Sequence, residues 1–216
     1  MSEGGGGMQA YHILNAMIAN KLAVVIRGDN QFMAKKTAEA CVNGGVKTLE
    51  VTFTVPSASS LLESLNEDYD HVIFGAGTVL DSETARIAIS SGARFIVSPG
   101  FDKDTAKLCN RYGIPYLPGC MTVNEMLHAA EYGASVVKLF PGSEFTPSFI
   151  KNIHGPLPHI DIMPTGGITI DNADDWLAAG AVMLGVGGEI TKPAKIGDYD
   201  GVKKLAAEFQ NLTTKG

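Results

Sequence analysis

The sequence predicts an α/β protein that forms a single (β/α)₈ TIM barrel with an N-terminal helix. Three observations lead to this prediction. Eight short apolar runs alternate with helix-patterned segments, the runs are apolar throughout, and glycines recur where one pattern gives way to the other. Continuously apolar strands are typical of parallel sheets buried on both faces. Eight βα units in 216 residues would form a compact barrel.

Each predicted strand is a short run rich in apolar and β-branched residues, with Gly or Pro near its end. The predicted strands are residues 22–27, 48–52, 72–74, 95–98, 116–117, 136–140, 160–163 and 182–186. Between them, segments such as 32–42 and 83–89 repeat apolar residues at three- and four-residue spacing, as amphipathic helices do. The alternation indicates repeated βα units.

Residue types at the helix ends support these units. The predicted helices end at Gly45, Gly92, Gly113, Gly133 and Gly180, each followed by an apolar residue. Glycine readily adopts the left-handed backbone that ends many helices. The expected N-caps are Ser82, Asp102, Thr122 and Asp171.

An open doubly wound sheet is the alternative arrangement of such units. It would normally carry a Gly-rich dinucleotide loop after the first strand, whereas Arg27 and Gly28 there lie in no such fingerprint. Residues 1–7 form a Gly-rich leader that we expect to be flexible and added to the natural chain. The barrel domain would then span residues 8–216.

Composition narrows the possible partners. The net charge of −6 and pI of about 5.3 oppose nucleic-acid binding, which needs a basic surface. No apolar run approaches the length of a membrane span, and no signal-peptide pattern is present. Cys41, Cys109 and Cys120 lack CxxC spacing and should be reduced and packed. We expect a cytoplasmic protein that binds neither nucleic acid nor membranes.

Catalytic groups of such barrels lie at the C-terminal ends of the strands. This rule selects the polar residues Arg27, Glu50, Thr52, Thr78, Ser98, Lys138 and Thr165. Lys138 is the most informative, because a lysine within an apolar strand is costly to bury unless it is paired or neutral. A desolvated neutral amine is a nucleophile toward carbonyl groups. The alternative is a lysine whose amine reaches outward to solvent.

Glu50 lies in another apolar strand and can reach the same interior. Imine formation and carbon–carbon cleavage both require proton transfers, which a carboxylate can perform. An ion pair with Lys138 or Arg27 is the structural alternative, and it is compatible with catalysis because such a pair also perturbs pKa values.

Glycine-rich segments follow the last two predicted strands, at 165–168 and 185–188. Exposed backbone N–H groups at these positions bind phosphate in many barrels, although tight turns alone would also explain the glycines. The segment 75–78 is expected to be a third turn, which would present amides and a hydroxyl to a carboxylate.

Metal-dependent and other nucleophilic chemistry find no support in the motifs. The histidines, His12, His71, His128, His154 and His159, show neither HxH nor HExxH spacing. The chain also contains no GxSxG elbow and no Walker loop. We therefore expect no metal site.

Six motifs in a fixed order carry a resemblance that covers nearly the whole chain. They are residues 44–52, 75–79, 96–100, 118–119, 137–141 and 164–168. Together they resemble the bacterial family of 2-keto-3-deoxy-6-phosphogluconate (KDPG) and 4-hydroxy-2-oxoglutarate (KHG) aldolases.

The resemblance implies a cofactor-free class I aldolase in which Lys138 forms the Schiff base and Glu50 is the general acid and base. The implied substrate pocket comprises Thr78, Pro99, Phe140 and Thr165, and the implied phosphate site comprises Gly166, Gly167, Gly187 and Gly188. Some members hold the substrate carboxylate with an arginine where this sequence has Thr54, and Arg27 is the expected replacement.

The implied reaction cleaves 2-dehydro-3-deoxy-6-phosphogluconate to pyruvate and glyceraldehyde 3-phosphate, and also 4-hydroxy-2-oxoglutarate to pyruvate and glyoxylate. Similar proteins are usually homotrimers. Two alternatives remain open: cleavage of the galacto epimer, 2-dehydro-3-deoxy-6-phosphogalactonate, and a phosphosugar-binding or epimerase barrel without aldolase activity.

Overall fold

The computed structural model describes residues 6–214 and shows parallel strands in two sheets. The strands are β1 (Leu22–Ile26), β2 (Thr48–Thr52), β3 (Ile73–Gly77), β4 (Ile96–Val97), β5 (Tyr116–Leu117), β6 (Gly119–Cys120), β7 (Val136–Leu139), β8 (Asp161–Pro164) and β9 (Leu184–Val186). One sheet has the order β5-β4-β3-β2-β1-β9, and the other has the order β6-β7-β8. Only Pro118 separates β5 from β6, and a bridge between Thr165 and Gly185 links the ends of β8 and β9.

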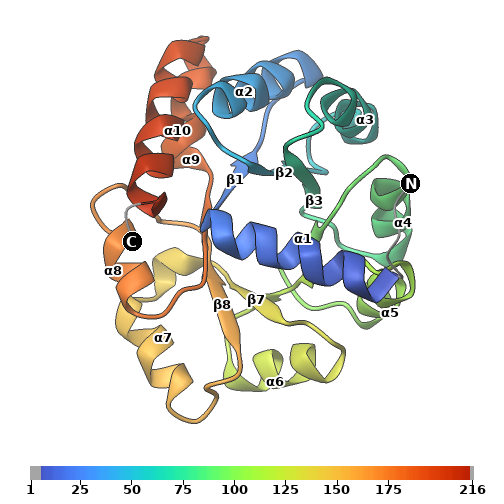
Figure 1. The fold of residues 1–216 in the computed structure, drawn as a ribbon, viewed down its shortest axis with the longest axis vertical. Helices are drawn as coiled ribbons and strands as arrows, with labels where there is room; N and C mark the ends of the chain where they lie inside the picture. The colour runs from blue at the N-terminus through green and yellow to red at the C-terminus, as the bar shows by residue number, and fades with distance from the viewer. Residues whose placement is uncertain (1–5, 215–216) are drawn as a thin grey trace.

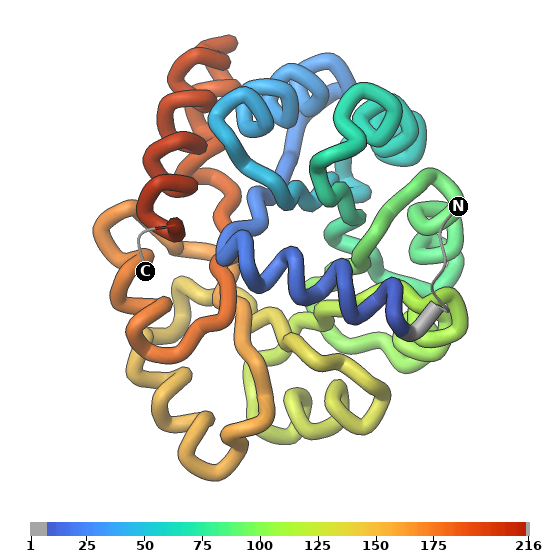
Figure 2. Tube along the Cα trace, in the orientation of Figure 1, coloured from blue at the N-terminus to red at the C-terminus, as the bar shows by residue number. Residues whose placement is uncertain are grey.

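Helices surround these curled sheets. They are α1 (Gly6–Asn20), α2 (Gln31–Asn43), α3 (Ala58–Asp68), α4 (Ser82–Ser90), α5 (Lys103–Tyr112), α6 (Val123–Glu131), α7 (Pro147–His154), α8 (Ala173–Ala178), α9 (Gly188–Thr191) and α10 (Tyr199–Thr214), with 3-10 turns η1 (Gly142–Glu144) and η2 (Lys192–Ile196). Helix α1 lies across the strands in Figure 1, and Figure 2 shows the other helices following one another around them in chain order.

The prediction of an α/β fold with parallel strands and an N-terminal helix is confirmed. Every predicted strand segment overlaps an observed strand. Residues 1–5 of the predicted leader lie outside the described residues, and Gly6 and Gly7 belong to α1.

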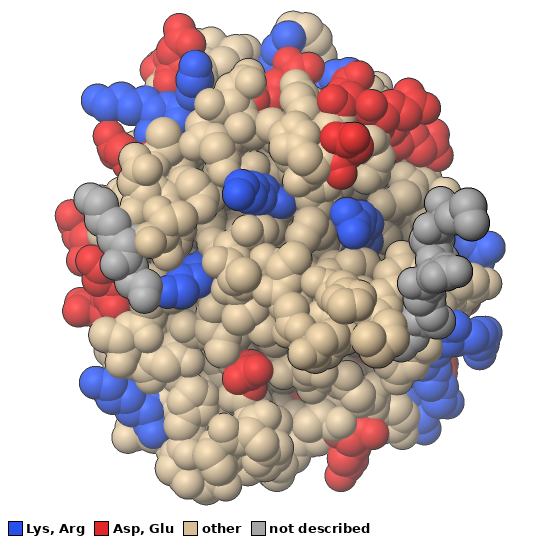
Figure 3. All heavy atoms as spheres, viewed as in Figure 1, with Lys and Arg blue, Asp and Glu red and all other residues tan. Residues whose placement is uncertain are grey.

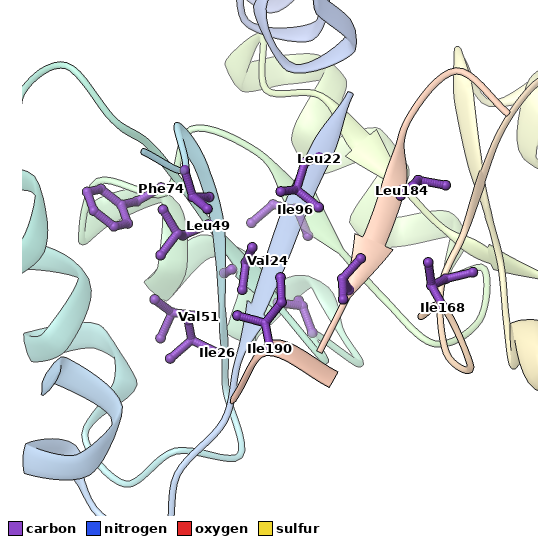
Figure 4. Packing of buried hydrophobic residues seen from close by; sticks show 14 of the residues in the cluster. Leu22, Val24, Ile26, Leu49, Val51, Phe74, Ile96, Ile168, Leu184 and Ile190 are labelled. Atoms are coloured by element: carbon purple, nitrogen blue, oxygen red, sulfur yellow. The ribbon is translucent and has the colours of Figure 1, made fainter. Parts of the chain in front are cut away.

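Successive side chains of a strand point to opposite faces of the sheet. Because most strands are apolar at consecutive positions, both of their faces are apolar. On the outer face, Leu22, Val24 and Ile26 of β1 join a cluster that includes residues of the surrounding helices (Figure 4). On the inner face, Phe95 and Met163 pack with Ile13 and Met17 of α1, among others. Helix α1 therefore covers the inner cluster.

The helix ends follow the expected glycines but not every expected cap. The five predicted glycines have φ values from 64° to 105°, and Asp102 and Thr122 cap their helices. The predictions of Ser82 and Asp171 as N-caps are wrong. Asp81 accepts the Thr84 N–H at 2.7 Å because it is the residue with extended backbone before α4, and α8 begins only at Ala173.

The surface shows no strong segregation of charge in the view of Figure 3. Neutral residues cover most of the face that carries α1, and acidic and basic side chains lie mainly around its rim.

The three cysteines are buried and unpaired, as expected, and burial raises the pKa of each thiol to about 12. Within residues 6–214, each helix is too short or too polar to cross a membrane.

Candidate active site

Lys138 and Glu50 meet in the interior enclosed by the strands. Lys138 is on β7 and Glu50 is on β2, which belong to different sheets, so their side chains approach across the interior. Lys138 Nζ is 3.9 Å from Glu50 Oε1, and the two side chains are 5% and 1% exposed. The alternative of an outward-pointing lysine is therefore wrong.

The buried amine and carboxylate are both available to a third group. Their 3.9 Å separation is longer than a hydrogen bond. Neither carboxylate oxygen of Glu50 has a hydrogen-bond partner among residues 6–214. Lys138 Nζ also lies 4.9 Å from the centre of the Phe140 ring, whose π face attracts a cation. A small carbonyl compound bound here would meet a nucleophile and a proton acceptor together.

Glycines in the strands provide the interior space. A Cβ atom at Gly75 would lie 2.5 Å from the Phe95 ring, and one at Gly185 would lie 2.1 Å from Thr165 Oγ1. The prediction that 75–78 form a turn is wrong for its first three residues, which belong to β3. Only Thr78 lies beyond the strand, with φ 55°. These glycines serve to admit neighbouring side chains rather than to turn the chain.

A pocket of about 230 Å³ lies beside Phe140, at the ends of β1, β8 and β9. Seven predicted site residues line it: Arg27, Phe140, Thr165, Gly166, Gly167, Gly187 and Gly188. Within the described chain, no protein atom accepts a hydrogen bond from the N–H of Gly167 or Gly188, and Thr165 Oγ1 is also buried without a partner. The pocket thus presents hydrogen-bond donors of the kind that bind anions.

Three lining residues were not predicted, namely Val25, Thr169 and Glu189. Glu189 carried a signal that sequence reasoning overlooked, since it directly follows Gly187 and Gly188. Val25 lies inside an apolar strand and carried none.

Other polar residues at the strand ends hold the backbone. Thr52 Oγ1 donates to the Ile26 carbonyl oxygen at 3.0 Å and lies 2.9 Å from Thr54 Oγ1. Ser98 Oγ lies 2.7 Å from the Tyr116 hydroxyl and donates to the Gly100 carbonyl oxygen. Ser98 therefore braces the loop that follows β4 and contains Pro99.

Thr78 and Pro99 follow β3 and β4 at the same end of the sheet. Neither forms a hydrogen bond with Lys138 or Glu50 in the described part of the chain, and Arg27 forms no ion pair there with Glu50. The structure groups Arg27 with the glycine segments instead. The residue predicted to bind the substrate carboxylate and the glycines predicted to bind phosphate thus line the same pocket.

A second pocket, of about 220 Å³, lies between α1 and the loops that precede β5 and β7. Tyr11, Tyr116 and Ser135 line it, and it contains neither Lys138 nor Glu50. It lies at the N-terminal ends of the strands, whereas the active sites of (β/α)₈ barrels lie at the C-terminal ends. Among the described residues, no group of three or more His, Cys, Asp or Glu side chains is placed to hold a metal ion.

Comparison with known proteins agrees with this arrangement. The family model described as KDPG and KHG aldolase matches residues 13–205. The chain is 34% identical over 175 residues to the 2-dehydro-3-deoxy-phosphogluconate aldolase of Treponema pallidum, covering 79% of this chain and 83% of that protein. It is 35% identical over 175 residues to the KHG/KDPG aldolase of Escherichia coli K12, covering 79% and 82%.

A solved structure is similar over almost its full length. The KDPG aldolase of Legionella pneumophila, with pyruvate captured as a covalent carbinolamine, has a TM-score of 0.81 and 27% identity, covering 95% of this chain and 98% of that one. The predicted family and the predicted carbon–carbon lyase class are confirmed. The chain belongs to the KDPG and KHG aldolase family.

Proposed function

We propose that this chain is a cofactor-free class I aldolase that cleaves 2-dehydro-3-deoxy-6-phosphogluconate to pyruvate and glyceraldehyde 3-phosphate. It also cleaves 4-hydroxy-2-oxoglutarate to pyruvate and glyoxylate. The observation that carries the proposal is the buried amine of Lys138, 3.9 Å from the Glu50 carboxylate. The names of the relatives support the substrate class.

In this mechanism the neutral Lys138 amine attacks the C2 ketone and forms a carbinolamine, which loses water to give an imine. The protonated imine withdraws electrons while Glu50 accepts the proton of the C4 hydroxyl. The C3–C4 bond then breaks and the aldehyde leaves. The electron pair of the broken bond moves toward the protonated imine, which becomes an enamine. Protonation at C3 and hydrolysis of the imine release pyruvate and restore the free lysine.

Substrate binding is assigned to the groups around this pair. Thr78, Pro99, Phe140 and Thr165 form the keto-acid pocket, and Arg27 binds the substrate carboxylate. The N–H groups of the Gly166–Gly167 and Gly187–Gly188 segments hold the phosphate. Support comes from the shared pocket and from the unpartnered N–H groups of Gly167 and Gly188.

The two sheets together form one eight-stranded barrel domain over residues 8–216, in which β5 and β6 are a single strand interrupted at Pro118. The Lys138 N–H donates to the Pro118 carbonyl oxygen at 2.8 Å, and the Val182 N–H donates to Ile162 at 3.1 Å. These bonds support closure on both sides. The protein assembles as a homotrimer, which sedimentation equilibrium would detect as three times the 22.8 kDa chain mass.

Borohydride reduction in the presence of pyruvate tests the mechanism. Peptide mass spectrometry should find the mass of reduced pyruvate on Lys138 and none on Lys107, whose side chain is 52% exposed. Lys138→Ala should abolish both the adduct and pyruvate release, while Lys107→Ala should leave both intact. An unmodified Lys138 in an enzyme that still cleaves its substrate would refute the role.

A further inference from the structure

Two charged residues line the pocket beside Phe140. Arg27 follows β1, and Glu189 lies in the first turn of α9, directly after Gly188. Neither side chain forms an ion pair with another described residue within 4.0 Å. The pocket lining thus contains one positive and one negative residue, and their formal charges cancel. This balance is unexpected for a site that receives a phosphate group.

The negative charge of Glu189 should repel a phosphate group bound in this pocket. A phosphate monoester carries about −1.5 to −2 charges at neutral pH. The N–H of Gly188 is unpartnered within residues 6–214 and is one of the donors assigned to that phosphate. A phosphate bound there would lie next to the carboxylate of the adjoining residue, and like charges at short range repel.

The Glu189 carboxylate is better suited to bind a substrate whose terminal group is a hydroxyl instead of a phosphate. An ionised carboxylate only accepts hydrogen bonds, so it pairs well with a hydroxyl group, which can donate one. An unphosphorylated sugar acid ends in such a hydroxyl. Its C1 carboxylate remains available to Arg27.

We propose that Glu189 is a specificity-determining residue that disfavours a phosphorylated tail and accepts a hydrogen bond from the terminal hydroxyl of an unphosphorylated 2-keto-3-deoxy sugar acid. This rests on the proposed aldolase function and adds a substrate class to it. The enzyme cleaves both kinds of substrate, with a smaller preference for the phosphate ester than the glycine segments alone would produce. Because Glu189 is exposed, solvent and salt weaken the effect.

Glu189→Gln tests the proposal because it removes the charge and keeps the shape. Glu83→Gln is the matched control: Glu83 is also an exposed acid in the first turn of a helix, but it lies on α4 and does not line the pocket. The measured quantity is the ratio of kcat/KM for 2-dehydro-3-deoxy-6-phosphogluconate to kcat/KM for its unphosphorylated counterpart. Glu189→Gln should raise this ratio about three- to tenfold at low salt, and less at high salt.

The control should leave the ratio unchanged. An equal shift in both variants, or no shift in Glu189→Gln, would overturn the role of Glu189. Glu189→Ser provides a second neutral variant if the glutamine variant folds poorly. Pyruvate alone forms the borohydride adduct without any substrate tail, so a missing adduct in the unaltered enzyme would overturn the aldolase function and this inference with it. An adduct with an unmoved ratio would overturn only the inference.

Discussion

Gly77 of β3 leaves the space that the Glu50 carboxylate occupies: a Cβ atom at Gly77 would lie 1.8 Å from Glu50 Oε1. Gly77 pairs with Thr52 on the neighbouring strand β2, two residues beyond Glu50. A methyl group at this position would therefore force the carboxylate to move. The absence of one side chain thus positions the acid of the site.

Gly77→Ala should therefore damage both stability and catalysis. Overpacking costs about 1–3 kcal/mol, which lowers the melting temperature by several degrees in a protein of this size. Displacement of Glu50 should lower kcat at least tenfold. Calorimetry and a pyruvate-release assay coupled to NADH oxidation measure the two effects. Gly100→Ala is the control, since its Cβ would meet no atom within 4 Å; equal behaviour of both variants would contradict the packing argument.

Glu50→Gln should lower kcat by about 10²- to 10⁴-fold, because an amide cannot accept the proton of the C4 hydroxyl. The Lys138 adduct with pyruvate should still form under borohydride, but more slowly. Glu208→Gln, on the exposed side of α10, controls for loss of one negative charge. An unchanged kcat in Glu50→Gln would remove Glu50 from the mechanism.

Arg27→Met should distinguish a carboxylate partner from a phosphate partner. Loss of a hydrogen bond between charged groups costs about 1.5–3 kcal/mol, or roughly 10- to 100-fold in kcat/KM. If Arg27 binds the carboxylate, phosphorylated and unphosphorylated keto acids should lose activity by the same factor. Loss confined to the phosphorylated substrate would assign Arg27 to the phosphate instead.

Tyr116 should make stability fall at alkaline pH. Burial raises the pKa of its hydroxyl to about 12, against the lowering effect of its hydrogen bond with Ser98. The unfolded chain loses this proton near pH 10, so between pH 10 and 12 ionisation favours unfolding and the stabilising contribution disappears as pH rises. Urea titrations should show a steeper loss of unfolding free energy in this window for the unaltered protein than for Tyr116→Phe. Parallel curves would contradict the assignment.

The same variant should also destabilise the protein near pH 7, by about 1–2 kcal/mol. The Tyr116 hydroxyl accepts the Asp102 N–H at 3.1 Å and bonds Ser98, so it holds the loop between β4 and α5. Since that loop contains Pro99, which is assigned to the keto-acid pocket, the KM for the keto-acid substrate should rise as well. An unchanged KM would separate the loop from substrate binding.

The sequence by itself determined the strands, the helix-ending glycines and the importance of Lys138. These are local properties: apolar runs specify buried strands, positive φ selects glycine, and a lysine in an apolar strand needs a reason to be there. The glycines of β3 were misread as a turn, because a glycine that makes room for Glu50 and one that turns the chain look alike in a sequence.

Only the tertiary structure decided which of these residues meet. Lys138 and Glu50 come from strands of different sheets, and their 3.9 Å approach depends on how those sheets curl. The same curvature brings Arg27, Gly167 and Glu189 from three separate segments to one pocket. Local propensity records the preferences of neighbouring residues, whereas contacts between distant segments depend on the packing of the whole sheet.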